Sequence, residues 1–179
     1  MANSISAALR SKSWSSLVAD IVLAGLVAGP LAAPFLAAAP LPILPQIADI
    51  IYTMGQAVCP QPALGPMLWP PHLMSVCTRC YGTVLGLAVT RWLYAQNQGR
   101  SRYWLDRYGL WGFVAAFITC LFYPLELALQ GFGGWGVNNG VMAIFGLIAG
   151  LGLGSYVMPI LHPGAIRTGP LGQLPNRQY

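Results

Sequence analysis

Charged residues are scarce in this sequence, and their scarcity excludes an ordinary water-soluble domain. Only 7% of the 179 residues are charged, whereas 56% are apolar. A soluble domain carries roughly a quarter charged residues because its surface must face water. We therefore predict that lipid is the main solvent of this chain, and that residues 1–179 fold as a single all-α membrane domain.

Motifs for catalysis and nucleic-acid binding are also missing. No stretch resembles a phosphate-binding loop, a haem-attachment motif or a Ser-His-Asp arrangement, and no row of polar residues lines a transport path. The net charge of +5 does not indicate nucleic-acid binding, because no basic patch is interleaved with aromatic residues. The sequence thus favours a non-enzyme but leaves enzymatic activity open.

Four segments of the sequence are apolar enough to cross a bilayer, which requires about 20 such residues. The predicted spans are residues 17–35, 73–95, 110–130 and 139–161. All of the basic residues except Arg79 precede the first span, lie at or in the 96–109 loop, or fall in the 162–179 tail. Since cytoplasmic loops retain positive charge, we predict cytoplasmic termini in a bacterial inner or internal membrane.

The first span also has features of a cleavable signal peptide. Arg10 and Lys12 precede an apolar run that leads to the small residues 37–39. The run extends from Leu17 to Leu44, which is long for a signal peptide. Retention as a span is therefore the favoured interpretation, and cleavage is the alternative.

Residues 36–72, here named the outer segment, form the longest predicted connection. Apolar residues recur in it at spacings of three and four, which predicts an amphipathic helix lying in the membrane interface, with Pro45 in its first turn. They are Ile47, Ile50, Ile51, Met54 and Val58. A proline-rich irregular loop should follow, with Trp69 as an interfacial anchor and His72 at its end.

Three cysteines are expected on the outer side of the membrane. Cys77 and Cys80 form a Cys-x-x-Cys motif at the start of the second span, and Cys59 ends the amphipathic helix. This pattern fits a redox-active pair, a structural disulfide, inert packing or a metal site such as zinc. In the metal interpretation His72 is the candidate fourth ligand. Cys120 should lie deeper, as a core residue.

Two further patterns predict helix contacts. Glu126 lies in the third span at the depth of Arg79, and because buried charges are usually paired, we predict an ion pair between them. Asp20 is expected at a solvated helix start, and Arg91 is expected to reach toward the cytoplasmic interface. Small residues spaced by four predict close helix packing, either within the chain or with a partner. They are Gly82, Gly86, Gly146, Gly150 and Gly154.

The cysteine motifs resemble those of an uncharacterised family of bacterial membrane proteins, domain of unknown function 2085. The family pattern places Cys-His-Gln after the first span and Cys-x-Arg-Cys-x-Gly at the start of the next. The second motif matches at Cys77, Arg79, Cys80 and Gly82, whereas the first matches at Cys59 and Gln61 only, with Pro60 in place of the His. The resemblance covers roughly residues 50–90 and the number of spans, and it implies no reaction.

Two hypotheses for function follow from these features. The first is a structural or accessory membrane protein, embedded in the bilayer and docked to a larger complex or to a second copy, whose cysteine cluster holds the outer segment through a metal or a disulfide. The second is a quinone-linked thiol–disulfide oxidoreductase that uses Cys77 and Cys80, with Cys59 in the outer segment.

Overall fold

The computed structural model describes residues 14–96, 102–132, 136 and 138–161, and most of these residues are helical. Its elements are α2 (Trp14–Ala37), α3 (Ile43–Val58), the short 3-10 helix η1 (Pro62–Leu64), β1 (Met67–Trp69), β2 (His72–Leu73), α4 (Thr78–Gln96), α5 (Arg102–Cys120), α6 (Phe122–Phe132) and α7 (Asn139–Leu161). The prediction of a mostly helical chain is thus confirmed. Arg10, Lys12, Arg100 and the 162–179 tail, on which part of the topology prediction depends, lie outside the described residues.

Within this described part of the chain, three helical segments are long and apolar enough to cross a membrane. They are Ser16–Ala37, Leu110–Phe132 and Asn139–Met158. The predicted span at 73–95 is not among them. Its helix, α4, has 19 residues but includes Arg79 and Arg91, two charged residues that lower its hydropathy.

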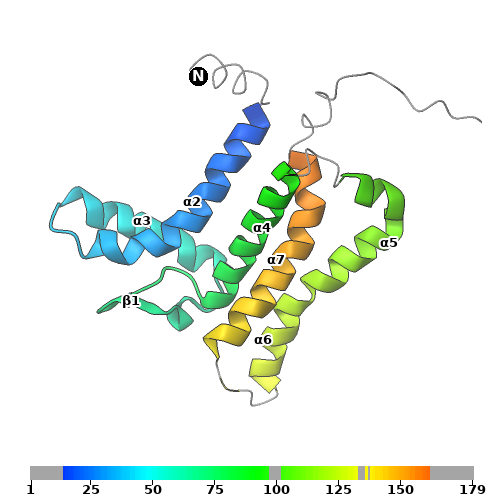
Figure 1. The fold of residues 1–179 in the computed structure, drawn as a ribbon. Coiled ribbons are helices and arrows are strands. Elements are labelled where there is room, and N and C mark those ends of the chain that lie inside the picture. The colour runs from blue at the N-terminus through cyan, green and yellow to red at the C-terminus, as the bar shows by residue number, and fades with distance from the viewer. Residues whose placement is uncertain (1–13, 97–101, 133–135, 137, 162–179) are drawn as a thin grey trace, which may run out of the picture.

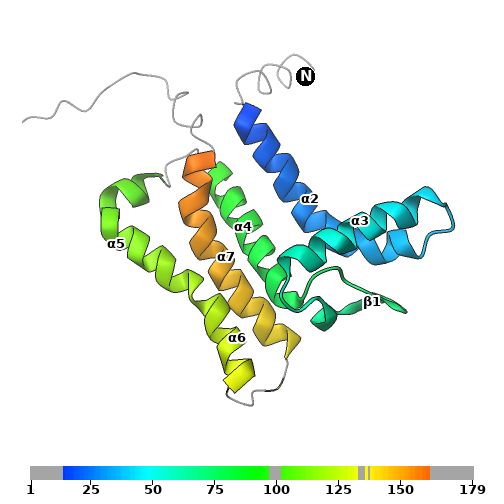
Figure 2. The ribbon, with the colours of Figure 1, turned by 180° about the vertical axis from the view of Figure 1, so that it is seen from behind.

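Helices α4 and α7 form the centre of the bundle and lie side by side in Figures 1 and 2. The glycines of both helices permit this contact. A Cβ atom on Gly146 or Gly150 would lie within 3.0 Å of backbone atoms of Arg79 or Thr83, and one on Gly82 or Gly86 would collide with the backbone of α7. The glycine pattern therefore packs two helices of the same chain, in parallel. The sequence had left open whether these glycines contact a helix of the same chain or of a partner, and the structure shows the first.

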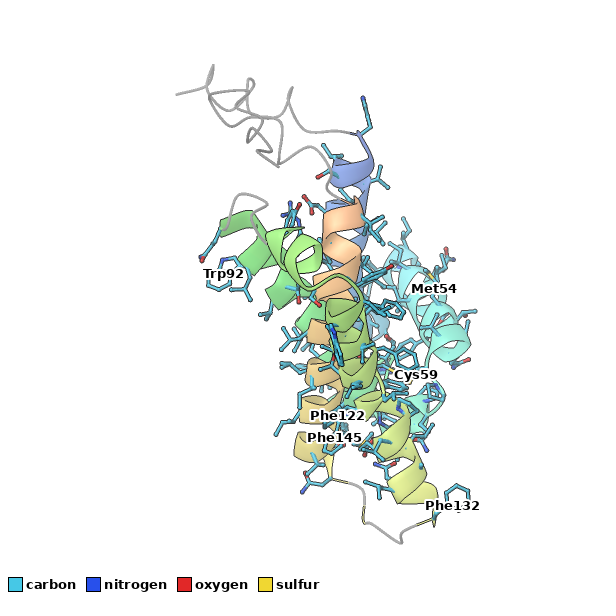
Figure 3. The ribbon with its side chains drawn as sticks, turned by 90° about the vertical axis from the view of Figure 1, so that its right-hand side faces the viewer. Met54, Cys59, Trp92, Phe122, Phe132 and Phe145 are labelled. Carbon is cyan, nitrogen blue, oxygen red and sulfur yellow. The ribbon has the colours of Figure 1, made fainter. Side chains whose placement is uncertain are left out.

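The third predicted span is divided into α5 and α6 at Leu121. Pro124 has no N–H to donate to the carbonyl group of Cys120, and its ring would clash with that carbonyl, so the helix is interrupted there. Both helices pack against α7. Thr119 of α5 lies against Gly152. The ring of Phe122 in α6 packs on that of Phe145 (Figure 3), with 5.7 Å between the ring centroids.

Helix α2 packs against α4, and α3 packs against α2 (Figure 1). Helix α3 buries its small residues Ala48 and Gly55 and exposes the apolar stripe that includes Ile50 and Met54; Figure 3 shows Met54 at the outer edge of α3. The expected irregular loop contains η1 and a hairpin, in which β1 pairs antiparallel with β2 around a cis peptide bond between Pro70 and Pro71. The hairpin was not predicted from the sequence, because proline-rich segments rarely carry a strand pattern.

Candidate functional site

Cys59, Cys77 and Cys80 come together at the N-terminal end of α4. Cys59 directly follows α3, Cys77 directly precedes α4, and Cys80 lies in the first turn of α4. Their three Sγ atoms all lie within 4.8 Å of one another, and those of Cys59 and Cys80 are 3.4 Å apart. Cys59 and Cys77 are buried and Cys80 is half-buried; all four cysteines of the chain are free thiols.

The end of α3 packs closely against the segment that precedes α4, and this packing holds Cys59 beside Cys77 and Cys80. Gly55, one turn before Cys59, lies so close to the backbone of Ser75 that a Cβ atom would not fit. The backbone N–H of Cys77 donates to Cys59 Sγ at 3.3 Å, and the hydroxyl of Tyr52 donates to the Leu73 carbonyl at 2.6 Å. Burial raises the pKa of the Tyr52 phenol. These contacts join the end of α3 to the segment that enters α4.

The cluster includes neither His72, the candidate fourth ligand, nor Cys120, which was predicted to lie deeper. Among the described His, Cys, Asp and Glu side chains, the group able to hold a metal consists of the three cysteines alone. His72 is instead part of the hairpin, where its backbone pairs with Trp69, so the expectation of His72 as fourth ligand is not supported. Cys120 lies on α5 with its Sγ 3.8 Å from the Ala149 carbonyl, away from the cluster as predicted.

A buried polar network lies beside the cysteines. Arg79, fully buried, donates through Nε to Glu126, which is 4% exposed; these are the two residues that the sequence paired. The remaining guanidinium nitrogens of Arg79 reach Gln130 Oε1 at 3.0 Å and Gln61 Oε1 at 3.4 Å, and Gln130 also donates to Glu126. Since a buried charge is stable only when it is paired and hydrogen-bonded, this network explains how Arg79 is accommodated.

Tyr123 is a site residue that sequence reasoning missed. Its hydroxyl lies 3.1 Å from Cys80 Sγ, and its ring centroid lies 5.6 Å from Cζ of Arg79. Tyr123, Glu126 and Gln130 follow one another at spacings of three and four, so one face of α6 serves both the cysteines and Arg79. That spacing was the available signal, but a tyrosine in an apolar span is usually only a packing residue.

Two buried hydroxyl groups flank Cys77 without an intramolecular partner. Ser75 Oγ and Thr78 Oγ1 make no hydrogen bond to any described residue. A buried hydroxyl without a partner costs on the order of 1–3 kcal/mol. The immediate surroundings of Cys77 are thus the part of the described core where the chain leaves polar groups unsatisfied.

A second ion pair lies at the opposite end of α4. Arg91 donates through Nε to Asp20 Oδ1 at 2.6 Å and through Nη2 to Asp20 Oδ2 at 3.0 Å. This corrects two sequence expectations, since Asp20 is not merely a solvated helix start and Arg91 does not simply extend to the interface. The pairing joins α2 to α4, with side-chain exposures of 27% for Asp20 and 21% for Arg91.

Comparison with known proteins finds one family. Residues 68–156 match the family model described as predicted membrane protein (DUF2085), so this part of the chain is similar to that family of membrane proteins. The matched residues include Cys77, Arg79 and Cys80, and they extend further toward the C-terminus than the cysteine motifs indicated. The first motif, with Cys59 and Gln61, precedes them. No curated protein and no solved structure matches the chain.

Proposed function

We propose that this protein is a four-span structural membrane protein whose outer segment is fastened to α4 by a metal ion bound to Cys59, Cys77 and Cys80. The observation that carries the proposal is the convergence of three thiol sulfurs within 4.8 Å from two separate parts of the chain. Thiolates select soft or borderline metals, and zinc fits a site built from cysteines without redox chemistry. Such a metal would contribute directly to folding.

Both arginines of α4 are paired with carboxylates, which supports α4 as a further span in addition to the three apolar helical segments. Its 19 residues would extend about 28 Å at 1.5 Å per residue, close to the thickness of the hydrocarbon core. Arg79 pairs with Glu126 of α6, and Arg91 pairs with Asp20 of α2. Both charges that lower its hydropathy thus have partners inside the bundle.

The arrangement of helix ends supports the proposed topology. The end of α4 at Gln96 lies near the end of α7, whereas both helices begin at the opposite end of the bundle, beside the hairpin (Figure 1). Along the chain, α5 and α6 connect the end of α4 to the start of α7 and cross back through the membrane. The cysteine cluster and α3 would then share the outer side. The exposed stripe on α3, with Ile43 67% exposed and Val58 73% exposed, would then face lipid in the interface. The pair between Asp20 and Arg91 favours retention of α2, because cleavage would leave Arg91 without this partner.

The accessory role, docking to a larger complex or to a second copy, has less support than the metal site. The glycine stripe that made an intermolecular contact plausible is used inside the chain, between α4 and α7. Docking would therefore have to use the exposed apolar faces of other helices. Sizing of the mildly solubilised protein tests this role, and a strictly monomeric particle without a partner would exclude it.

Elemental analysis combined with thiol counting tests the metal site. Purified full-length protein should carry about one metal ion per chain and show only Cys120 as a readily titrated thiol until a chelator is added. Cys59→Ser should lose the metal, whereas Cys120→Ser should retain it, because Cys120 lies outside the cluster. Metal-free protein with all four thiols titratable, or with a disulfide, would reject the proposal.

The 3.4 Å separation of the Cys59 and Cys80 sulfurs favours a second candidate, a quinone-linked thiol–disulfide oxidoreductase. Two thiols would form a disulfide and pass two electrons and two protons to a quinone, which becomes the quinol. This separation makes Cys59–Cys80 a candidate for the first disulfide, in addition to Cys77–Cys80. Mass spectrometry of the oxidised protein identifies the pair, and failure of the purified protein to reduce a quinone with a dithiol as donor would exclude this function.

A further inference from the structure

We propose that Tyr123 supplies the fourth ligand, so that Cys59, Cys77, Cys80 and the Tyr123 phenolate form a closed metal site for a zinc-class divalent ion. This inference rests on the proposed metal site. A structural zinc site is almost always four-coordinate, and the cluster of described residues offers three thiols and no further His, Cys, Asp or Glu. Tyr123 presents its oxygen 3.1 Å from Cys80 Sγ.

Two distances at Cys80 are close to those expected in a tetrahedral site. With metal–sulfur bonds of about 2.3 Å and a metal–oxygen bond of about 2.1 Å, two sulfur ligands lie about 3.8 Å apart, and a sulfur and an oxygen lie about 3.6 Å apart. The structure has 3.4 Å between Cys59 and Cys80 sulfurs and 3.1 Å between Cys80 Sγ and Tyr123 Oη. Binding therefore needs the Cys80 sulfur to move apart from these two neighbours by a few tenths of an ångström.

The net charge of the proposed site equals that of a common zinc site. A divalent ion with three thiolates and one phenolate carries a net charge of −2, the same as the common four-cysteine zinc site. The guanidinium of Arg79 lies over the Tyr123 ring, and the positive N-terminal end of α4 begins between Cys77 and Cys80. Metal binding would release the thiol and phenol protons to water.

Tyr123 would give the metal a wider structural role. Cys59 belongs to the outer segment, Cys77 and Cys80 to the start of α4, and Tyr123 to α6. The same face of α6 also carries Glu126 and Gln130 to Arg79. One ion would therefore join three elements of the fold, at the point where α6 is separated from α5 by the break at Leu121.

The test uses full-length protein in detergent, stripped of metal and titrated with zinc. Tyrosine ionisation is followed by its near-ultraviolet difference absorption. Wild type should bind one zinc ion and ionise one tyrosine. Tyr123→Phe should show no ionisation and bind zinc on the order of 10–100-fold more weakly. Tyr81→Phe is the matched control, because Tyr81 packs against the apolar core that includes Cys59 and Cys77 but directs its hydroxyl to the Val27 carbonyl.

The outcomes separate the two proposals. Zinc binding of equal strength in wild type and Tyr123→Phe, or an ionisation signal that survives in Tyr123→Phe, overturns the role of Tyr123 and leaves the cysteine site standing. No zinc binding in any variant overturns both. If Tyr123→Phe does not fold, the presence or absence of tyrosine ionisation in the wild-type titration decides the question.

Discussion

The two ends of α4 each hold a charged arginine within the helix bundle, but the two arginines differ in burial and in the number of their partners. Each carries an arginine paired with a carboxylate from a neighbouring helix. Arg79 is fully buried and bonded to Glu126, Gln130 and Gln61, whereas Arg91 is bonded to Asp20 and remains partly exposed. The comparison teaches that burial determines how many partners a charge needs. We therefore expect the N-terminal end of α4 to dominate stability.

The largest expected effect is the loss of the Arg79 counter-charge. Glu126→Gln keeps the size of the side chain but leaves a buried guanidinium without its anion, which costs about 3–5 kcal/mol. The free energy of unfolding, measured by SDS titration of the detergent-solubilised protein, should fall by that amount. A loss no greater than that of Asp20→Asn would contradict the proposed difference between the two ends.

The glycines of α7 allow a second comparison between the ends. Gly146 faces the backbone of Arg79, whereas Gly154 faces the side chain of Thr90. A backbone cannot rotate away, so Gly146→Ala should destabilise the protein by about 1–3 kcal/mol and Gly154→Ala by less. The same SDS titration measures both. Gly25→Ala is the control, because no atom lies within 4 Å of a Cβ at that position; equal losses at Gly146 and Gly25 would reject the close packing.

Tyr52 tests the packing of the outer segment near the N-terminal end of α4. Tyr52→Phe removes the hydrogen bond to the Leu73 carbonyl and should cost about 1 kcal/mol. Because burial raises the folded-state pKa above the ordinary value of 10.0, the unfolded chain loses the phenol proton first as pH rises. This contribution is therefore complete below about pH 10 and declines above it.

The pH dependence gives the control for Tyr52. Unfolding measured from neutral pH to above pH 10 should show a smaller alkaline loss of stability in Tyr52→Phe than in the wild type. Identical alkaline slopes in the two proteins would show that Tyr52 is not protected in the folded state.

The smallest effect is expected at the C-terminal end of α4. Asp20→Asn should lower the free energy of unfolding by about 1 kcal/mol or less, because the ion pair is partly exposed and screened. A double-mutant cycle with Arg91→Gln isolates the pair. A coupling energy as large as that between Arg79 and Glu126 would mean that the two ends are equivalent.

Several site features could be predicted because local patterns carry them. Cys77, Arg79 and Cys80 follow one another at the start of a helix, and the depth of Glu126 in its own apolar segment made it the natural partner of Arg79. Tyr123, Gln61 and Gln130 could not be assigned in this way. Their roles depend on how α6 and the outer segment are rotated about their axes, and neither hydropathy nor cysteine spacing encodes that rotation.

The sequence by itself determined the class of the protein, because charge content and the length of apolar segments are sufficient to distinguish a lipid-embedded helical chain from a soluble one. It also predicted three cysteines on one side of the membrane, two of them at the start of one helix. Only the tertiary structure decided which residues meet there. It paired Asp20 with Arg91 and placed Tyr123, and not His72, beside Cys80. It also packed the glycines of α7 against α4 of the same chain. The physical reason is that helix formation is governed by near neighbours, whereas these contacts join residues from separate helices, whose mutual packing decides which side chains face one another.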